Sequence, residues 1–302
     1  MTATVPFERT SATVGTDAQF DMIARLARQE AGLVIAPEKA PMVFARLGRR
    51  MRATGQSDIA AYCRLLESDA GAEERRHLIY ALTTNVTSFF REKHHFDYLE
   101  AEVLPALSDR LAAGGRVRFW SAGCSTGMEP YSLAMIALDR LGADASGDFR
   151  ILATDLDPNV LTVARRGRYP AAALDKLPQG YLDRFFRPAA DEPDSYDVAP
   201  DVRAPVRFRQ LNLLEAWPMR GTFDAIFCRN VVIYFDQETQ RALWPRFAAA
   251  CASGGHIFLG HSERLQADAA HTFTAVATTT YRLDAPSTGA DKAESREPAS
   301  WR

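Results

Sequence analysis

Cysteines are scarce in this sequence, and long apolar runs are absent. The four cysteines among 302 residues are scattered, and none has the C-x-x-C spacing of a zinc site or a redox motif. We therefore predict neither a metal site nor a disulfide framework, and we expect reduced, buried thiols. No apolar run approaches the roughly 20 residues that a membrane-spanning helix needs.

The sequence also lacks a recognisable leader. Residues 1–16 are polar and have no apolar core of the kind that a signal peptide contains. We therefore expect a cytoplasmic protein with no segment inserted in a membrane.

An excess of charge of either sign is missing as well. The chain has 36 Lys and Arg residues against 38 Asp and Glu residues, a formal net charge of -2. A general nucleic-acid binder would carry a strong positive field, so we expect no nucleic-acid partner. With 47% hydrophobic and 25% charged residues the chain has an ordinary globular composition, and its length suggests two domains.

The most informative stretch of the sequence runs from residue 116 to residue 132. Phe119 and Trp120 favour a β-strand, and Gly123 then opens a run of small residues that suits a tight turn near a ligand. Pro130 fits the first turn of a helix, where its missing N–H costs nothing. Strand, glycine turn and helix together predict the start of a nucleotide-type binding fold.

The turn lacks two common nucleotide-binding signatures. It has neither the G-x-G-x-x-G spacing of dinucleotide sites nor the lysine of a triphosphate loop. Glu129 stands where a phosphate would meet the helix N-terminus, and its charge would repel a pyrophosphate. An acid here suits a ligand with ammonium or hydroxyl donors, which favours S-adenosylmethionine over a dinucleotide. On the turn alone, an α/β core whose glycine turn binds nothing is an equal alternative.

Periodicity divides the chain into five segments. Apolar residues at helical spacing predict an all-helical front domain, and alternating strands and helices after residue 116 predict a doubly wound, mostly parallel sheet. A proline-rich interruption with short β-like pieces predicts a small inserted β subdomain. The expected segments are a disordered tail at 1–16, the helical domain at 17–84, a connector with a linking helix at 85–115, the α/β domain at 116–284 with its insert at 167–210, and a disordered tail at 285–302.

Polar residues follow three of the expected strands. Asp155 ends the second strand, and Asn212 and Asn230 follow two later apolar stretches. Ligands of doubly wound sheets bind at the carboxyl ends of the strands, so an acid could accept ribose hydroxyls there and the amides could contact an adenine edge. Loop capping is the alternative role for each asparagine.

The histidines do not indicate a catalytic triad. His94 and His95 stand at a helix start and are expected on the surface. His261 follows the last parallel strand and could reach the site, but it has no Asp and Ser partners in triad order.

Five motifs, in order between Asp17 and Leu283, resemble the chemotaxis receptor glutamate methyltransferases, the CheR family. They are Asn85-x-Thr87-x-Phe89-Phe90-Arg91, Gly123-Cys-Ser-Thr-Gly-Met-Glu129-Pro-Tyr-Ser, Ala153-Thr-Asp155-Leu-Asp, Asn212-Leu213-Leu214 and Cys228-Arg229-Asn230-Val-Val-Ile-Tyr234-Phe235-Asp. The family also has a helical front domain and an inserted β piece, which match the segments described above.

The resemblance implies methyl transfer from S-adenosylmethionine to a glutamate on a chemoreceptor's cytoplasmic coiled coil. The products are a methyl ester and S-adenosylhomocysteine. It also implies that the methyl group lies near Arg91 and Tyr234. The positions that it implies for the cofactor are Asn85, Thr87, Arg91, Gly123, Glu129, Asp155, Asn212, Leu213, Arg229 and Asn230.

The chemistry fits a site with no strong general base. A glutamate side chain has a pKa of about 4.3 and is already an anion at neutral pH. It must be held in line with the methyl group at roughly 3–3.5 Å. Arg91 could orient that carboxylate, and Tyr234 could donate a hydrogen bond or pack beside the methyl group. Arg91 could alternatively form a salt bridge between the two domains.

A cluster of four arginines in the helical domain suggests where an acidic receptor docks. A solvated helix face is the alternative interpretation. The cluster consists of Arg46, Arg49, Arg50 and Arg52.

Two departures from the family pattern are visible. Met128 stands where relatives often carry Glu. Some members use a glycine-containing loop of the β subdomain to bind a receptor's C-terminal pentapeptide, but residues 187–197 contain no glycine. We therefore expect direct receptor binding without a peptide tether.

Three other functions compete with this one. A methyltransferase with a non-receptor substrate is disfavoured, because amide enzymes commonly carry an Asn-Pro-Pro-Tyr-like motif where this chain has Arg229-Asn230-Val231-Val232. A non-catalytic module that binds S-adenosylmethionine or S-adenosylhomocysteine is disfavoured by the presence of both Arg91 and Tyr234. An NAD-dependent oxidoreductase fits the sequence least well.

Overall fold

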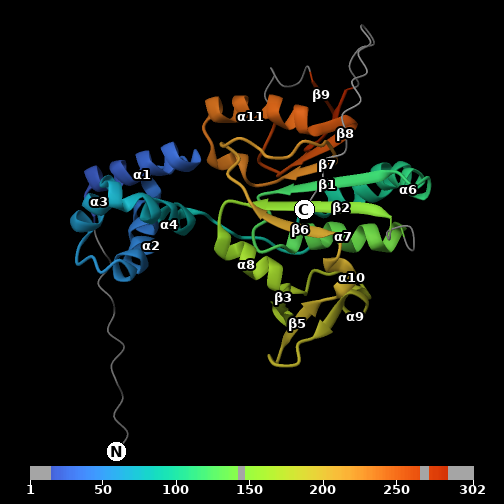
Figure 1. The fold of residues 1–302 in the computed structure, drawn as a ribbon, viewed down its shortest axis with the longest axis horizontal. Helices are drawn as coiled ribbons and strands as arrows, with labels where there is room; N and C mark the ends of the chain where they lie inside the picture. The colour runs from blue at the N-terminus through green and yellow to red at the C-terminus, as the bar shows by residue number, and fades with distance from the viewer. Residues whose placement is uncertain (1–14, 142–146, 266–271, 285–302) are drawn as a thin grey trace, which may run out of the picture. The chain divides into compact units, whose positions relative to one another are not determined.

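The chain separates into two compact units, Met1–Thr84 and Asn85–Arg302. A computed structural model describes residues 15–141, 147–265 and 272–284 (Figure 1). We call Met1–Thr84 the helical unit and Asn85–Arg302 the sheet unit, and each is described by itself.

The helical unit packs four α-helices around a small apolar core. Ile23, Leu47, Leu66 and Leu78 are fully buried in it. The elements are α1 (Asp17–Ala31), η1 (Pro37–Lys39), α2 (Ala40–Ala53), α3 (Ile59–Glu67), η2 (Asp69–Gly71) and α4 (Ala72–Leu82).

One buried acid joins three helices of the helical unit. Glu74 of α4 accepts hydrogen bonds from the Tyr62 hydroxyl of α3 at 2.6 Å and from Nε and Nη2 of Arg50 of α2 at 2.9 and 2.5 Å. Glu74 is 7% exposed. Because a buried charge without partners is costly, these bonds fix how α2, α3 and α4 meet.

A seven-stranded sheet forms the centre of the sheet unit. Its order is β6-β2-β1-β7-β8-β10-β9, and the first five strands are parallel, whereas β10 is antiparallel to both β8 and β9. The expected doubly wound, mostly parallel sheet is confirmed. The strands are β1 (Arg116–Ala122), β2 (Asp148–Asp155), β6 (Val206–Gln210), β7 (Phe223–Cys228), β8 (Cys251–Leu259), β9 (Phe273–Ala277) and β10 (Thr280–Leu283).

The strand order reverses between β1 and β7. From β1 the chain moves outward to β2 and β6, then returns to the other side of β1 with β7 and β8. Open α/β sheets bind ligands at such a switch point, outside the carboxyl ends of the strands. We call the carboxyl ends of β1, β2 and β7 the rim.

Alternating side chains of the strands build one apolar core on each face of the sheet. Phe119 of β1 belongs to the core under α6 (Leu104–Ala112), α7 (Met128–Leu141) and α8 (Pro158–Arg166). Its neighbour Trp120 packs on the other face with residues of α11 (Gln237–Ala250), and Figure 1 shows α11 on the opposite side of the sheet from α7 and α8. Burial on both faces explains why the later parts of β1 and β2 and most of β7 are apolar.

The linking helix is not the continuous helix that its apolar stripe predicts. It consists of α5 (Lys93–Tyr98), a π-helical turn, η3 (Leu99–Val103), and then α6. Pro105, in the first turn of α6, has no N–H for a carbonyl of the preceding turn, and its ring crowds that turn. The wider π turn accommodates this within an otherwise helical segment.

The inserted β subdomain is a separate three-stranded sheet with order β3-β5-β4. The expected boundary of 167–210 is wrong at its end, because β6 pairs in parallel with β2 and is an edge strand of the main sheet. Val206 and Phe208 of this strand lie in the core of the sheet unit. The elements of this region are β3 (Arg168–Pro170), η5 (Ala171–Ala173), α9 (Tyr181–Phe185), β4 (Phe186–Pro188), β5 (Ser195–Val198) and α10 (Pro200–Arg203).

Two findings complete the description of the fold. All four cysteines are free and buried, as expected. Among the described residues, no helix combines the length and the apolar composition needed to span a membrane.

Candidate functional site

The glycine turn after β1 is closed against the end of β2. The N–H groups of Gly123 and Cys124 both donate to the carbonyl of Thr154 at 2.8 Å. Gly123 has a φ of 85°, which favours glycine, and a Cβ there would lie 2.3 Å from Cγ2 of Val231. The turn therefore requires glycine for two reasons, and it is packed directly against the segment that follows β7.

Asp155 is held by the same turn. Its carboxylate accepts the N–H of Ser125 at 2.8 Å and the N–H of Asp157 at 3.0 Å. Burial raises the pKa of Asp155, while these N–H groups oppose the shift. An ionised carboxylate has about four lone-pair sites, so Asp155 keeps acceptor capacity for hydroxyl groups of a ligand.

The connector before α5 reaches this turn. The Ser125 hydroxyl donates to the carbonyl of Asn85 at 2.9 Å, and the Asn85 amide donates to Asp157 at 3.3 Å. Phe90 is tied to α7 because its N–H donates to the Ser132 hydroxyl at 3.1 Å. The connector is thereby placed along the rim, with Thr87 half-buried between these contacts.

A buried ion pair joins β7 to the start of α7. Nε of Arg229 donates to Glu129 at 2.7 Å, and the Ser121 hydroxyl donates to the other oxygen of Glu129 at 2.7 Å. Nη1 of Arg229 donates to the carbonyl of Arg91 at 2.5 Å. Arg229 therefore fixes the backbone that carries Arg91, and Glu129 has a cationic partner within the protein itself.

Arg91 is only half-buried, unlike Arg229. Its Nη1 donates to the carbonyl of Val86 at 2.9 Å, within the connector. The residues on either side, Phe90 and Glu92, have φ values of 51° and 58°. This left-handed backbone is uncommon outside glycine, so the surrounding contacts must hold the connector in place.

His95 is fully buried, which contradicts its expected surface position. Its Nε2 lies 2.8 Å from the Thr279 hydroxyl and its Nδ1 lies 3.1 Å from Nη1 of Arg229. Burial, with the nearby Arg229 charge, lowers the pKa of His95 to about 3, so the ring is neutral at pH 7. A pattern of two adjacent histidines does not distinguish the exposed ring of His94 from the buried ring of His95.

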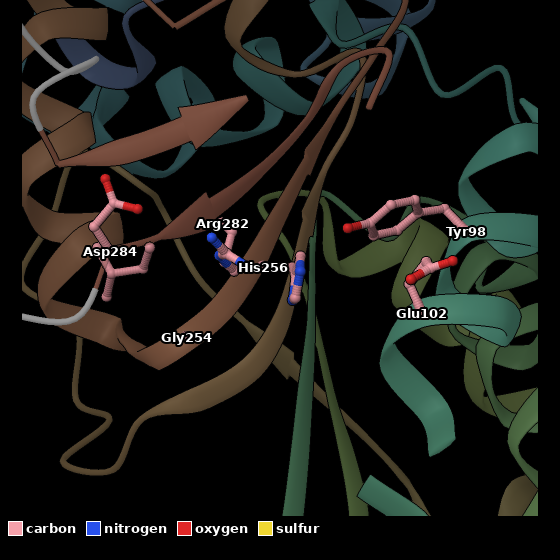
Figure 2. A pocket seen from close by; sticks show the side chains of 7 residues that line it. Tyr98, Glu102, Gly254, His256, Arg282 and Asp284 are labelled. Carbon is pink, nitrogen blue, oxygen red and sulfur yellow. The ribbon is translucent and has the colours of Figure 1, made fainter. Parts of the chain in front are cut away.

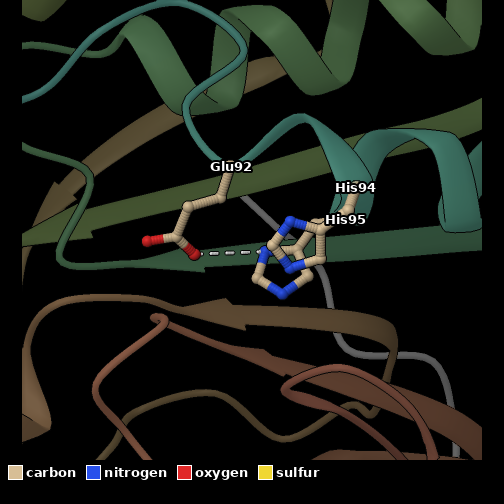
Figure 3. A group of neighbouring side chains, drawn as sticks. All are labelled: Glu92, His94 and His95. Atoms are coloured by element: carbon tan, nitrogen blue, oxygen red, sulfur yellow. Dashed lines mark ion pairs between the residues drawn. The ribbon is translucent and has the colours of Figure 1, made fainter.

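The side chains of Glu92, His94 and His95 form a cluster of the kind that can bind a metal ion (Figure 3). Both ring nitrogens of His95 already face partners, and Arg229 brings a positive charge to the same place. A cation would have to displace that guanidinium. We therefore interpret the cluster as the support of Arg229.

Asn230 follows β7 in a left-handed conformation, with a φ of 58°. Its N–H donates to the carboxylate of Glu263 at 2.9 Å. Tyr234 ends η6 (Val232–Tyr234) and is half-buried. The only sequence signal for Glu263 was an acid two residues after His261, and such a residue is usually solvated.

Asn212 and Leu213 lie just beyond β6. The Asn212 side chain accepts the N–H of Leu214 at 3.0 Å, so it does cap a turn. Leu213 is buried, and its carbonyl accepts from Trp217 Nε1 at 3.1 Å and Arg246 Nη1 at 2.6 Å.

The four arginines suggested for receptor docking separate into two pairs. Arg50 binds Glu74, and Nη1 of Arg46 donates to the carbonyls of Leu82 and Thr83 at 2.8 Å each. These two stabilise the helical unit. Arg49 and Arg52 are exposed on α2.

A cavity of about 470 Å³ lies elsewhere in the sheet unit. Figure 2 shows Tyr98 and Glu102 on one side of it and His256 and Arg282 on the other. It includes Gly254, near the amino end of β8, whereas the rim is formed by carboxyl ends. This cavity is therefore distinct from the site at the rim.

The rim has the features that S-adenosylmethionine requires. It combines a glycine turn at the carboxyl end of β1, a buried acid with spare acceptor capacity in Asp155, and amides at Asn85 and Asn230. The fold and this site define an S-adenosylmethionine-dependent methyltransferase.

Family comparisons identify the particular group. The CheR methyltransferase SAM-binding domain matches residues 85–282, and the CheR methyltransferase all-alpha domain matches residues 18–83. The chain belongs to the CheR methyltransferase family.

Named relatives agree with this assignment. The chain is 44% identical over 254 residues to a probable chemotaxis protein methyltransferase of Rhizobium etli, covering 84% of this chain and 95% of the relative. It is 43% identical over 251 residues to the chemotaxis protein methyltransferase of Escherichia coli K12, covering 82% and 85%. It is 41% identical over 256 residues to chemotaxis protein methyltransferase 2 of Pseudomonas aeruginosa, covering 83% and 87%. The protein is a methyltransferase that acts in chemotaxis.

Proposed function

We propose that this enzyme methylates glutamate side chains on the cytoplasmic coiled coil of methyl-accepting chemoreceptors. The observation that carries the proposal is the partly buried hydrogen bond from Arg229 to the Arg91 carbonyl. It holds a half-buried arginine, the group best suited to orient a carboxylate, beside the rim that binds the cofactor. The names of the relatives agree with a substrate in chemotaxis, and we expect a cytoplasmic enzyme.

The cofactor would be held by groups from four parts of the sheet unit. The turn at Gly123 meets it through its backbone, Asp155 accepts its hydroxyl groups, and Asn85 and Asn230 contact it through their amides. Glu129 contributes less directly than expected, because Arg229 and Ser121 already occupy one site on each of its oxygens. The remaining proposed contacts come from Thr87, Arg91, Asn212, Leu213 and Arg229.

The bound cofactor supplies a methyl group activated by a sulfonium. The glutamate is an anion at neutral pH and needs no proton removed, so the enzyme's task is to align it. Arg91 orients the carboxylate without neutralising it fully. Tyr234 donates a hydrogen bond or packs beside the methyl group.

Receptor docking is assigned to Arg49 and Arg52, the two exposed members of the α2 cluster. In the β subdomain, Arg168 pairs with Asp197 at 2.7 Å and with Asp191 at 2.5 Å. Residues 187–197, which include both acids, contain no glycine. We therefore propose direct receptor binding without a pentapeptide tether.

Labelled cofactor and receptor cytoplasmic fragments test the proposal. We expect base-labile label on the fragments, and label lost when the acceptor glutamates are changed to alanine. Arg91→Ala should retain part of its S-adenosylhomocysteine affinity by calorimetry but lose methyl transfer. Binding of cofactor without any transfer to receptors by the unaltered enzyme would instead indicate a non-catalytic module or another substrate.

A further inference from the structure

One buried carboxylate accepts four backbone N–H groups beside the rim. Oε1 of Glu263 accepts from Val231 at 2.9 Å and from Ile233 at 3.1 Å. Oε2 accepts from Asn230 at 2.9 Å and from Gly260 at 2.5 Å. Glu263 is 3% exposed. All the acceptor capacity of the side chain is therefore directed at the backbone.

Three of the four donors belong to one segment. We call residues 229–234, which run from the end of β7 to the end of η6, the wall loop. The left-handed conformation of Asn230 directs consecutive N–H groups of this loop toward a common point, as in the backbone nests that bind anions. Without an acceptor these partly buried N–H groups would lose their only protein partner, which is disfavoured.

The wall loop also packs on the glycine turn. The side chain of Val231 fills the space beside Gly123, where an added Cβ would come within 2.3 Å of it. Arg229, at the start of the loop, donates to Glu129 and to the Arg91 carbonyl. A shift of the loop would thus move one side of the cofactor site relative to the turn.

A negative charge suits this position better than an amide does. Hydrogen bonds from N–H groups to a carboxylate are roughly twice as strong as those to a neutral acceptor. Glutamine has the same shape, but its NH₂ group would face two of the N–H donors instead of accepting from them. Burial raises the pKa of Glu263, and the four N–H groups oppose that effect.

We propose that Glu263 is a positioning residue, whose carboxylate fixes the wall loop so that Asn230 and Tyr234 meet the cofactor and the acceptor. It acts through the loop backbone and contacts neither molecule itself. The part concerning Tyr234 rests on the proposed function, whereas the part concerning cofactor affinity does not.

The first test is a comparison of two isosteric variants in the full-length enzyme. Glu263→Gln should weaken S-adenosylhomocysteine binding by at least about tenfold in calorimetry, because one acceptor oxygen, which serves two of the four N–H donors, becomes an NH₂ group. Glu74→Gln is the matched control. This variant also removes a buried carboxylate that accepts several hydrogen bonds, but that carboxylate lies in the helical unit. The affinity of the variant for S-adenosylhomocysteine should stay within about twofold of that of the unaltered enzyme. Equal affinity for Glu263→Gln and the unaltered enzyme would overturn the proposal.

A double-mutant cycle separates positioning from simple loss of stability. Tyr234→Phe should reduce kcat in the unaltered enzyme. In the Glu263→Gln background, the same change should reduce kcat by less than half of that fold-change. Full additivity of the two changes would count against positioning of Tyr234. If the unaltered enzyme transfers no methyl group to receptor fragments, the proposed function fails while the affinity comparison still tests Glu263.

Hydrogen exchange tests the same idea without any variant. Before cofactor is added, the amides of residues 230, 231 and 233 should be protected about as strongly as those of β7. Exchange at the rate of an unstructured peptide would show that the carboxylate does not hold the loop. This measurement remains decisive even if Glu263→Gln fails to fold.

Discussion

The guanidinium of Arg229 bonds to the Glu129 carboxylate at 2.7 Å across a separation of 100 residues in the sequence. The same side chain lies over the rings of Phe96 and Phe227, with distances of 5.4 and 5.8 Å to their centroids. Its side chain is 2% exposed and that of Glu129 is 10% exposed. The proposed cofactor site thus contains an almost fully buried ion pair that also holds the connector.

Removing the cation of this pair should strongly destabilise the folded protein. Arg229→Met leaves Glu129 buried without its charge partner, so we expect the free energy of unfolding to fall by about 3–5 kcal/mol. Urea unfolding followed by tryptophan fluorescence measures this, because Trp120, Trp217 and Trp244 all lie in the sheet unit. Lys93→Ala is the control, since its partner Asp97 and Lys93 itself are both exposed and should contribute less than about 1 kcal/mol. Similar losses for the two variants would refute the assigned importance of the buried pair.

Alanine substitutions at two glycines with similar φ values distinguish the effect of backbone strain from that of a side-chain contact. Gly123→Ala and Gly114→Ala each place a side chain at a positive φ, 85° and 78°, which costs roughly 1–2 kcal/mol. Only at Gly123 does the new Cβ meet another residue, whereas nothing lies within 4 Å at Gly114. We expect Gly123→Ala to weaken S-adenosylhomocysteine binding by at least about tenfold and Gly114→Ala to leave it within about twofold. Comparable affinities by calorimetry would mean that the turn tolerates a displaced Val231.

Acid should weaken the helical unit through Glu74. Burial acts to raise the pKa of Glu74, but the bonds from Arg50 and Tyr62 outweigh it and leave that pKa lowered. A carboxyl with a lowered pKa in the folded state stabilises the fold above its unfolded pKa of about 4.3, and this contribution is lost as the pH falls below that value. Glu74→Gln should cost about 1–3 kcal/mol above pH 5 and remove most of the acid dependence.

The loss of stability in acid can be measured locally by hydrogen exchange of α4 peptides between pH 6 and pH 3.5, corrected for intrinsic rates. Lys39→Ala provides a control on the same unit, because Lys39 is exposed at the start of α2. An unchanged acid response in Glu74→Gln would assign the effect to other carboxyl groups.

Local patterns in the sequence were sufficient for the sheet, the glycine turn and the polar strand ends. Apolar strands, Gly123 and Asp155 each carry a signal that depends only on their immediate neighbours. The edge strand β6 was assigned to the insert because it follows a proline-rich stretch with other short β-like pieces, and only its pairing with β2 shows where it belongs.

The supporting groups of the site depend on contacts between distant segments. His95 lies against Thr279, 184 residues away, and Glu263 accepts from a loop 30 to 33 residues earlier. No periodicity or spacing encodes such pairs. Arg46 and Arg50 appeared equivalent to Arg49 and Arg52 for the same reason, since their partners lie on α4 and in the segment that follows it.

Receptor recognition should depend on the exposed arginines alone. The double change Arg49→Ser and Arg52→Ser removes two positive charges from α2 without touching the bonds that Arg46 and Arg50 form. We expect KM for receptor fragments to rise by about five- to thirtyfold, with kcat and S-adenosylhomocysteine affinity unchanged, because docking charges act on encounter and binding. The salt dependence of kcat/KM should also flatten, since fewer screened charge contacts remain. Arg64→Ser, at another exposed arginine of the same unit, should leave KM within about twofold. A fall in kcat at unchanged KM in the double variant would place these arginines in the reaction instead of in docking.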